Sequence, residues 1–169
     1  MWIFENHRIQ AAFLRISALR AEKYNAPYVA APLSAIRQML AFADVNPEDT
    51  VYDLGCGDER TVITAAKEFG ARAVGIELDP LRYLWCEMLV TLLGLRGRVN
   101  IILGDFFTAD LGNADVVACY IGQDANKKIQ EKFKKELRRN SRIISYNFIF
   151  SELTLIKEDD EAGLYLYRI

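Results

Sequence analysis

Histidine is the scarcest functional side chain of this sequence, which has a single one, His7, among its 169 residues. Catalytic sites that use a histidine base, and metal sites built from several imidazoles, need more than this chain offers. We therefore exclude serine-hydrolase and zinc-protease chemistry, and we expect no resident metal.

Cysteine is also sparse. Cys56, Cys86 and Cys119 are odd in number, lie far apart in the sequence and include no C-x-x-C pair. This spacing predicts neither a metal-binding knuckle nor a disulfide framework. A reducing, cytoplasmic setting fits such a chain best.

The sequence lacks an apolar run of the roughly 20 residues that a membrane-spanning helix needs. Its opening stretch is apolar, but Glu5, Arg8 and Arg15 interrupt it, so we expect neither a signal peptide nor a membrane span there. The net charge of −2, from 21 basic and 23 acidic residues, creates no overall positive field that would gather nucleic acid or anionic lipid.

Strand and helix patterns alternate through most of the chain. Apolar residues at helical spacing predict helices over residues 5–20, 33–40, 62–69, 80–93 and 124–138. Short apolar runs predict strands over residues 50–54, 73–77, 99–103, 114–120, 142–150, 153–156 and 164–169. The alternation predicts a doubly wound, mostly parallel sheet that ends in an antiparallel hairpin. The 80–93 helix is apolar nearly all round, so we expect it to be buried on several sides.

Ligands of such sheets bind where the strands end, and the first strand ends in an acid. Asp53 is followed by Gly55, Cys56 and Gly57, and glycines at this spacing allow a tight turn and a close approach of a ligand to the backbone. The carboxylate would repel the pyrophosphate of a dinucleotide, whereas it would hold an ammonium group. The turn therefore predicts a ligand with a cationic end.

The next two strands also end in acids. Glu77 can accept hydrogen bonds from the two hydroxyls of a ribose, and Leu78 can lie against a purine. After the third strand, Asp105 can accept from an adenine amine while Phe106 packs on the base. Three acids at three successive strand ends describe a ligand with an adenine, a ribose and an amino-acid end, which is S-adenosylmethionine.

Three motifs carry a family resemblance from about Pro27 onward. VYDLGCGDER, GIELDP and LGDFF resemble the cofactor motifs of the class I S-adenosylmethionine-dependent methyltransferases. The resemblance implies a Rossmann-like fold of three layers, αβα, around a seven-stranded sheet whose last strand is antiparallel. We expect residues 33–169 to form this domain, and residues 1–32 to supply an N-terminal helix and a segment that covers the cofactor.

Within that class, the chain is most similar to the small archaeal protein-lysine methyltransferases and their eukaryotic relatives that act on the c-ring of ATP synthase. The likeness rests on APYVAAP, DLGCGDER and KKIQEKFKKELRRNSRIISYNF. It implies lysine methylation in a protein substrate, and a cofactor-covering role for Tyr28. The sequence departs from the family at Ala31, which has no hydroxyl, and at Glu59, where glycine is usual.

Methyl transfer from a sulfonium is an in-line displacement that needs alignment and exclusion of water, with neither a metal nor a covalent intermediate. A lysine acceptor must first lose its proton, which a channel lined by aromatic and amide groups promotes. We take Tyr120, Gln123 and Asn147 as the catalytic candidates, with Gly122 and Tyr28 beside them, and Tyr120 also as a cofactor contact. The alternative for these residues is an ordinary place in the core or a loop.

The sequence is also compatible with methyl acceptors other than lysine. The fourth strand ends in CYIGQD, without the Asn/Asp-Pro-Pro-aromatic motif typical of base N-methylation, which is therefore disfavoured. Residues 127–142 hold eight basic residues, a pattern that fits RNA, an acidic protein or simply a solvated helix face. An RNA or small-molecule methyltransferase and a non-catalytic cofactor-binding module are the alternatives, and the N-terminal helix could touch a membrane surface.

Overall fold

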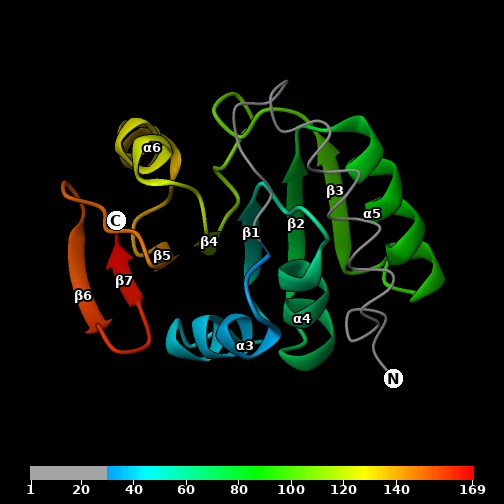
Figure 1. Cartoon of the computed structure of the whole chain (residues 1–169), viewed down its shortest axis with the longest axis horizontal. Helices are drawn as coiled ribbons and strands as arrows, with labels where there is room; N and C mark the ends of the chain where they lie inside the picture. The colour runs from blue at the N-terminus through cyan, green and yellow to red at the C-terminus, as the bar shows by residue number, and fades with distance from the viewer. Residues whose placement is uncertain (1–29) are drawn as a thin grey trace. The chain divides into compact units, whose positions relative to one another are not determined.

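Seven strands form a single sheet in the order β3-β2-β1-β4-β5-β7-β6 (Figure 1). The computed structural model describes residues 30–169. Neighbouring strands pair in parallel except β7, which runs antiparallel to both β5 and β6. The predicted, mostly parallel sheet with an antiparallel last strand is thus confirmed. The strands are β1 (Thr50–Leu54), β2 (Arg72–Glu77), β3 (Val99–Leu103), β4 (Val116–Cys119), β5 (Arg142–Tyr146), β6 (Thr154–Asp159) and β7 (Leu164–Arg168).

Four helices accompany the sheet in the described part of the chain: α3 (Leu33–Phe42), α4 (Arg60–Glu68), α5 (Pro80–Leu92) and α6 (Gln123–Glu136). The predicted start of α5 is confirmed, because Asp79 accepts a hydrogen bond from the Leu81 N–H at 2.8 Å and Pro80 occupies the first turn. Helix α5 therefore begins directly after β2 ends at Glu77.

The core lies on both faces of the central strands. Ile129 and Phe133 of α6 are fully buried against Tyr52 and Val117 of the sheet. Side chains alternate along a strand, so Val116 points to the opposite face, where it is buried as well. The central strand is therefore covered on both sides, as its apolar sequence predicted.

Two expectations about the elements are wrong. Strand β5 ends at Tyr146 instead of reaching residue 150, because Asn147 adopts the left-handed conformation, φ 63°, and turns the chain out of the sheet. Helix α5 is not buried on several sides: in the described part of the chain it packs on β2 and β3 at one end of the sheet, and its other apolar side chains stay exposed. Its outward side chains are exposed: Leu81, Leu84, Met88 and Leu92.

The predicted 5–20 helix and Tyr28 lie outside the described residues, so the proposed division at residue 32 stays a prediction. Residues 30–169 include no helix of the length and apolarity needed to cross a bilayer.

Strand β6 forms one edge of the sheet, and all six of its residues are exposed. It pairs with β7 alone, and the register shifts between Leu155 and Lys157. Such a shift leaves Ile156 as an extra residue and twists the edge locally.

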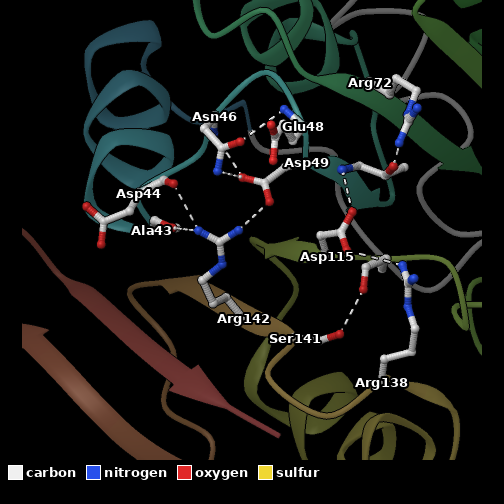
Figure 2. A network of polar contacts seen from close by, with 12 residues as sticks. Ala43, Asp44, Asn46, Glu48, Asp49, Arg72, Asp115, Arg138, Ser141 and Arg142 are labelled. Carbon is white, nitrogen blue, oxygen red and sulfur yellow. Dashed lines mark hydrogen bonds and ion pairs between the residues drawn. The ribbon is translucent and has the colours of Figure 1, made fainter.

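A polar network ties together the amino-terminal ends of β1, β4 and β5 (Figure 2). Arg142 donates to Asp49 at 2.5 Å and to the carbonyls of Ala43 and Asp44 at 2.7 and 2.9 Å. Figure 2 also shows Arg138 paired with Asp115 at 3.2 Å. Asp49 and Asp115 are each paired with an arginine, so the charges of these two acids at the amino-terminal edge of the sheet are balanced.

Candidate functional site

A glycine turn follows β1 and bends across the end of β2. The N–H groups of Gly55 and Cys56 donate to the Ile76 carbonyl at 2.9 and 3.0 Å. Gly55 has φ 76° and Gly57 has φ 57°, and residues other than glycine disfavour this left-handed region. The predicted tight turn is thus present, and it leaves bare backbone at the start of α4.

Cys56 fits into this turn because a neighbour is small. A side chain at Gly75 would bring its Cβ to 2.7 Å from the Cys56 sulfur. The Cys86 thiol of α5 donates to the Gly57 carbonyl at 3.4 Å, and the Cys56 thiol donates to the Cys86 sulfur; this second bond, followed by burial, raises the pKa of Cys56 well above its ordinary value. Both cysteines are free and buried thiols, so they pack the turn against α5.

Asp53 lies near the end of β1, buried beside the glycine turn. Burial raises the pKa of its carboxyl to about 7, a hydrogen bond with the Thr61 side chain opposes that rise, and the charges of Asp58 and Glu77 add to it. A carboxyl with this pKa ionises readily when a cation approaches. The position and the pKa of Asp53 therefore suit an ammonium group, and its contact with the cofactor stays a prediction.

Glu77 ends β2 and is held from two sides. Its carboxylate accepts the Gly57 N–H at 3.0 Å and the Asp79 N–H at 2.9 Å, and Arg82 lies 3.7 Å away. Burial raises the pKa of Glu77, while these hydrogen bonds and the arginine oppose the rise. Each oxygen keeps a second lone pair, so the fixed carboxylate can still accept hydrogen bonds from ribose hydroxyls.

Arg60, at the start of α4, pairs with Asp58 of the glycine turn. It donates through Nε to both oxygens of Asp58 at 2.8 and 2.9 Å, its terminal nitrogen also pairs with Asp58, and it donates to the Ala31 carbonyl at 2.9 Å. The guanidinium therefore joins the glycine turn to the segment that leads into α3. Sequence reasoning missed this link, because no local pattern connects Arg60 with Ala31.

Glu59 occupies the position at which the family usually has glycine. Its backbone is left-handed, φ 67°, and its side chain is fully buried. Neither carboxyl oxygen has a hydrogen-bond partner among residues 30–169. Burial first, then the charges of Asp58 and Glu87, raise the pKa of Glu59 to about 9, so it is protonated at neutral pH.

The predicted adenine contacts lie at the ends of β2 and β3, which are adjacent strands. Leu78 is 45% exposed and so can meet a base. Asp105 accepts the Phe107 N–H at 2.9 Å with one oxygen. Phe106 is half-buried against the core, and its ring centroid lies 4.6 Å from that of Phe107, which is more exposed and was not among the predicted contacts.

The residues that we predicted to line the lysine channel lie where β4 and β5 end. The Tyr120 ring lies 5.1 Å from that of Tyr146 and 6.1 Å from that of Phe148, measured between centroids. Gln123 donates to the Ile149 carbonyl at 2.9 Å, and the Asn147 N–H donates to Gly163 at 2.8 Å. Tyr146 and Phe148 were missed, although their alternation in SYNF was the available signal.

Comparison with known proteins gives this geometry a context. Residues 53–157 match the family model described as the ANTKMT methyltransferase domain. The chain is 39% identical over 150 residues, 85% of this chain and 93% of the other, to a "Protein-lysine N-methyltransferase" of Saccharolobus islandicus. It is 28% identical over 105 residues to a human lysine N-methyltransferase named for the C subunit of ATP synthase, covering 62% of this chain and 45% of that protein.

Among solved structures, the chain is similar to an RNA methyltransferase from Salinibacter ruber in complex with S-adenosyl-L-homocysteine. The TM-score is 0.78 at 34% identity, and the match covers 83% of this chain and 92% of the other. The archaeal relative and this structure are each matched over nearly their whole length, whereas the human protein is matched over less than half.

Proposed function

The chain belongs to the ANTKMT methyltransferase domain family and is an S-adenosylmethionine-dependent methyltransferase, and we propose that it methylates lysine side chains of proteins. The archaeal relative of similar length, named as a protein-lysine methyltransferase, supports this acceptor. The eukaryotic relatives support it less directly, because the chain spans about half of their length.

One observation carries the cofactor assignment: the carboxyl edge of the sheet holds more buried acids than cations. Asp53 has a pKa raised to about 7 and no arginine partner in the described part of the chain, while Glu77 lies at the neighbouring strand end. S-adenosylmethionine carries an ammonium group and a sulfonium, so its charge complements this edge. The residues present therefore fit the cofactor, with Asp53 toward the amino-acid end and Glu77 toward the ribose.

The residues of the chain align the reactants. When bound, the cofactor supplies a methyl group on a positively charged sulfur, which is already activated for transfer. Asp53 would hold the amino-acid end of the cofactor and Glu77 its ribose, and the bare backbone at Gly55 and Gly57 would allow close approach. Orientation of this kind contributes several kcal/mol to a displacement reaction, on the order of 7 or more in well-aligned cases.

The acceptor amine must be neutral, although free lysine has a pKa of about 10.4. Tyr120, at the end of β4, is half-buried, and removal of water from the primary ammonium of unmethylated lysine, which gives up three N–H hydrogen bonds to water, favours its neutral form. The cofactor would supply the methyl group to the amine nitrogen with its sulfur as the leaving group, and the proton lost by the ammonium would pass to water. Gln123 holds the neighbouring segment through the Ile149 carbonyl, so its role here is to position that segment.

RNA methylation is the second candidate, for two reasons. The Salinibacter structure carries that activity in its description. Helix α6 also begins beside the acceptor corner and exposes Lys127, Lys128 and Lys135. Other cations of this helix are engaged within the chain: Lys132 with Glu136 at 2.6 Å, and Lys134 with Glu131 at 2.9 Å.

Transfer of a labelled methyl group separates the two candidates. The purified chain is incubated with labelled S-adenosylmethionine and a cell lysate, either treated with ribonuclease or with protease. Under our proposal, label stays with protein after ribonuclease treatment, and mass spectrometry places it on lysine. The Asp53→Asn variant is the control for contaminating enzymes. Label that disappears with RNA would replace lysine by the second candidate.

A further inference from the structure

Three aromatic rings at the acceptor corner form one partly exposed surface, and we infer that it holds the methylated ammonium group of lysine between successive transfers. This three-ring surface consists of Tyr120, Tyr146 and Phe148, each half-buried. The inference rests on the proposed lysine specificity and adds to it a selection for cationic, methylated forms. Of its members, Tyr120 alone was expected from the sequence to face the acceptor.

The surface exists because β5 stops early. Asn147 takes φ 63°, a conformation that asparagine tolerates better than most residues. The turn places Phe148 back over the end of β4, with its ring 6.1 Å from Tyr120. Had the strand continued, Tyr146 and Phe148 would have pointed to the same face of the sheet at the spacing of a strand, away from the end of β4.

The segment after β5 is fixed by four hydrogen bonds. The Asn147 N–H donates to the Gly163 carbonyl at 2.8 Å, and the buried Ser145 hydroxyl donates to the Phe148 carbonyl at 2.5 Å. Gln123 reaches the Ile149 carbonyl at 2.9 Å, and the Phe150 N–H donates to the Tyr167 hydroxyl at 3.0 Å. A ligand therefore meets rings already in place, without the entropic cost of ordering a loop.

A second aromatic set in the same segment shows what a purely structural role looks like. Phe150 packs edge-on against Phe133 and Tyr167, at 5.7 and 5.4 Å, and all three are buried. The Tyr167 hydroxyl is used internally, because it accepts the Phe150 N–H. In contrast, each member of the three-ring surface keeps part of its side chain exposed. The three-ring surface is thus accessible, whereas the neighbouring set fills the core.

The ring geometry suits a compact cation better than a nucleobase. Tyr120 and Tyr146 touch at 5.1 Å with their planes 55° apart, which leaves no parallel slot into which a base could slide. Phe148 is tilted by 32° relative to Tyr120. An ammonium needs only to lie within about 6 Å of ring faces, and several tilted rings offer this at once. We therefore commit to methylated lysine as the ligand.

Binding of small probes tests the inference without any need for turnover. NMR follows the ring signals of the S-adenosylhomocysteine-bound protein during titration with the methylamide of acetylated trimethyl-lysine. A neutral isostere, in which carbon replaces the charged nitrogen, is titrated separately. We expect the cation to bind about threefold to thirtyfold more tightly than the isostere, and to shift the signals of the three rings.

Tyr146→Leu and Phe148→Leu should reduce this preference, whereas Tyr83→Leu on α5 should leave it unchanged. Since the comparison of the two probes uses the unmodified protein, it stands even where a variant fails to fold. Equal affinity for both probes, or shifts confined to other residues, overturns the inference. Ring shifts caused by uridine or adenosine monophosphate in place of the cation overturn it also and favour RNA. Methyl transfer to lysine with equal probe affinities would leave the proposed function standing.

Discussion

The two edges of the sheet differ in how they hold buried acids. At the amino-terminal edge, Asp49 faces Arg142 and Asp115 faces Arg138 (Figure 2). At the carboxyl-terminal edge, Asp53 and Glu59 are buried with raised pKa values. An acid that has a cationic partner stabilises the fold, whereas an acid held without one costs stability until a cationic ligand arrives.

The comparison separates stability from function within one sheet. The amino-terminal network connects residues far apart in sequence, such as Asp49 and Arg142, and so closes the fold. At the carboxyl edge, Asp58 pairs with Arg60 and Glu77 lies 3.7 Å from Arg82, whereas we propose that Asp53 serves the cofactor. The predictions below test this separation by comparing effects on stability with effects on cofactor affinity.

The largest expected effect is on stability, from Arg142→Leu. This change leaves Asp49 buried without its charge partner and frees two carbonyls, at Ala43 and Asp44. We expect the free energy of unfolding to fall by about 3 kcal/mol in urea titrations. Calorimetry should show unchanged affinity for S-adenosylmethionine. A matched double variant, Arg142→Leu with Asp49→Leu, should regain part of the loss, and a loss no greater in the single than in the double variant would contradict this account.

Next in size is the loss of cofactor affinity in Asp53→Asn. The amide keeps the shape of the side chain but removes the charge that holds an ammonium, a contact worth roughly 1.5 to 3 kcal/mol. We expect the Kd to rise about tenfold or more by calorimetry, with stability unchanged or improved. Glu77→Gln should act similarly. Asp115→Asn, on the amino-terminal edge, is the control, and an equal effect there would remove the distinction between the edges.

Cofactor affinity should depend on pH as a bell. Since the pKa of Asp53 is raised to about 7, the carboxyl is protonated below that pH and binding must release the proton. Affinity should therefore fall by up to about tenfold per unit below pH 7, and also above about pH 8, where an α-amino group loses its charge. Calorimetry in buffers of different ionisation enthalpy counts the released proton. Asp53→Asn should lose the acidic limb, and its persistence would exclude Asp53 as the titrating group.

The smallest effect expected is a gain of about 1 kcal/mol in stability from Glu59→Gly. Glycine removes the penalty of a left-handed side chain and an unpartnered carboxyl, at the cost of some chain entropy. With a raised pKa, Glu59 contributes most to stability below pH 4.5, and that contribution is lost as the pH rises to about 9. Both Glu59→Gly and Glu59→Gln should flatten this decline in thermal unfolding experiments, and only glycine should also relieve the strain.

The common location of the three acids could be predicted from the sequence, because a parallel sheet brings the ends of its strands to one edge. Asp53, Glu77 and Asp105 each follow an apolar run, and the strand order then makes them neighbours. Helix periodicity was less informative for α5, because an apolar helix pattern does not reveal how many sides have a partner. The exposed Leu84 and Leu92 are the result.

Contacts across the fold were beyond sequence reasoning. Arg142 reaches Asp49 over 93 positions, and Arg60 reaches Ala31 over 29, without a local pattern to announce either. The end of β5 was missed because it depends on the backbone conformation of Asn147, which apolar residues on both sides conceal. The three-ring surface follows from that turn, so it could not be predicted without it.

Strand β6, finally, bears on how the protein behaves at high concentration. An edge strand offers unpaired N–H and C=O groups to other molecules, and Leu155 and Ile156 add exposed apolar surface there. The register shift beside Ile156 and the charges of Lys157, Glu158 and Asp159 work against such pairing. The outermost strand therefore acts as a guard against edge-to-edge aggregation, and neutralising its charges would lower solubility before it altered the fold.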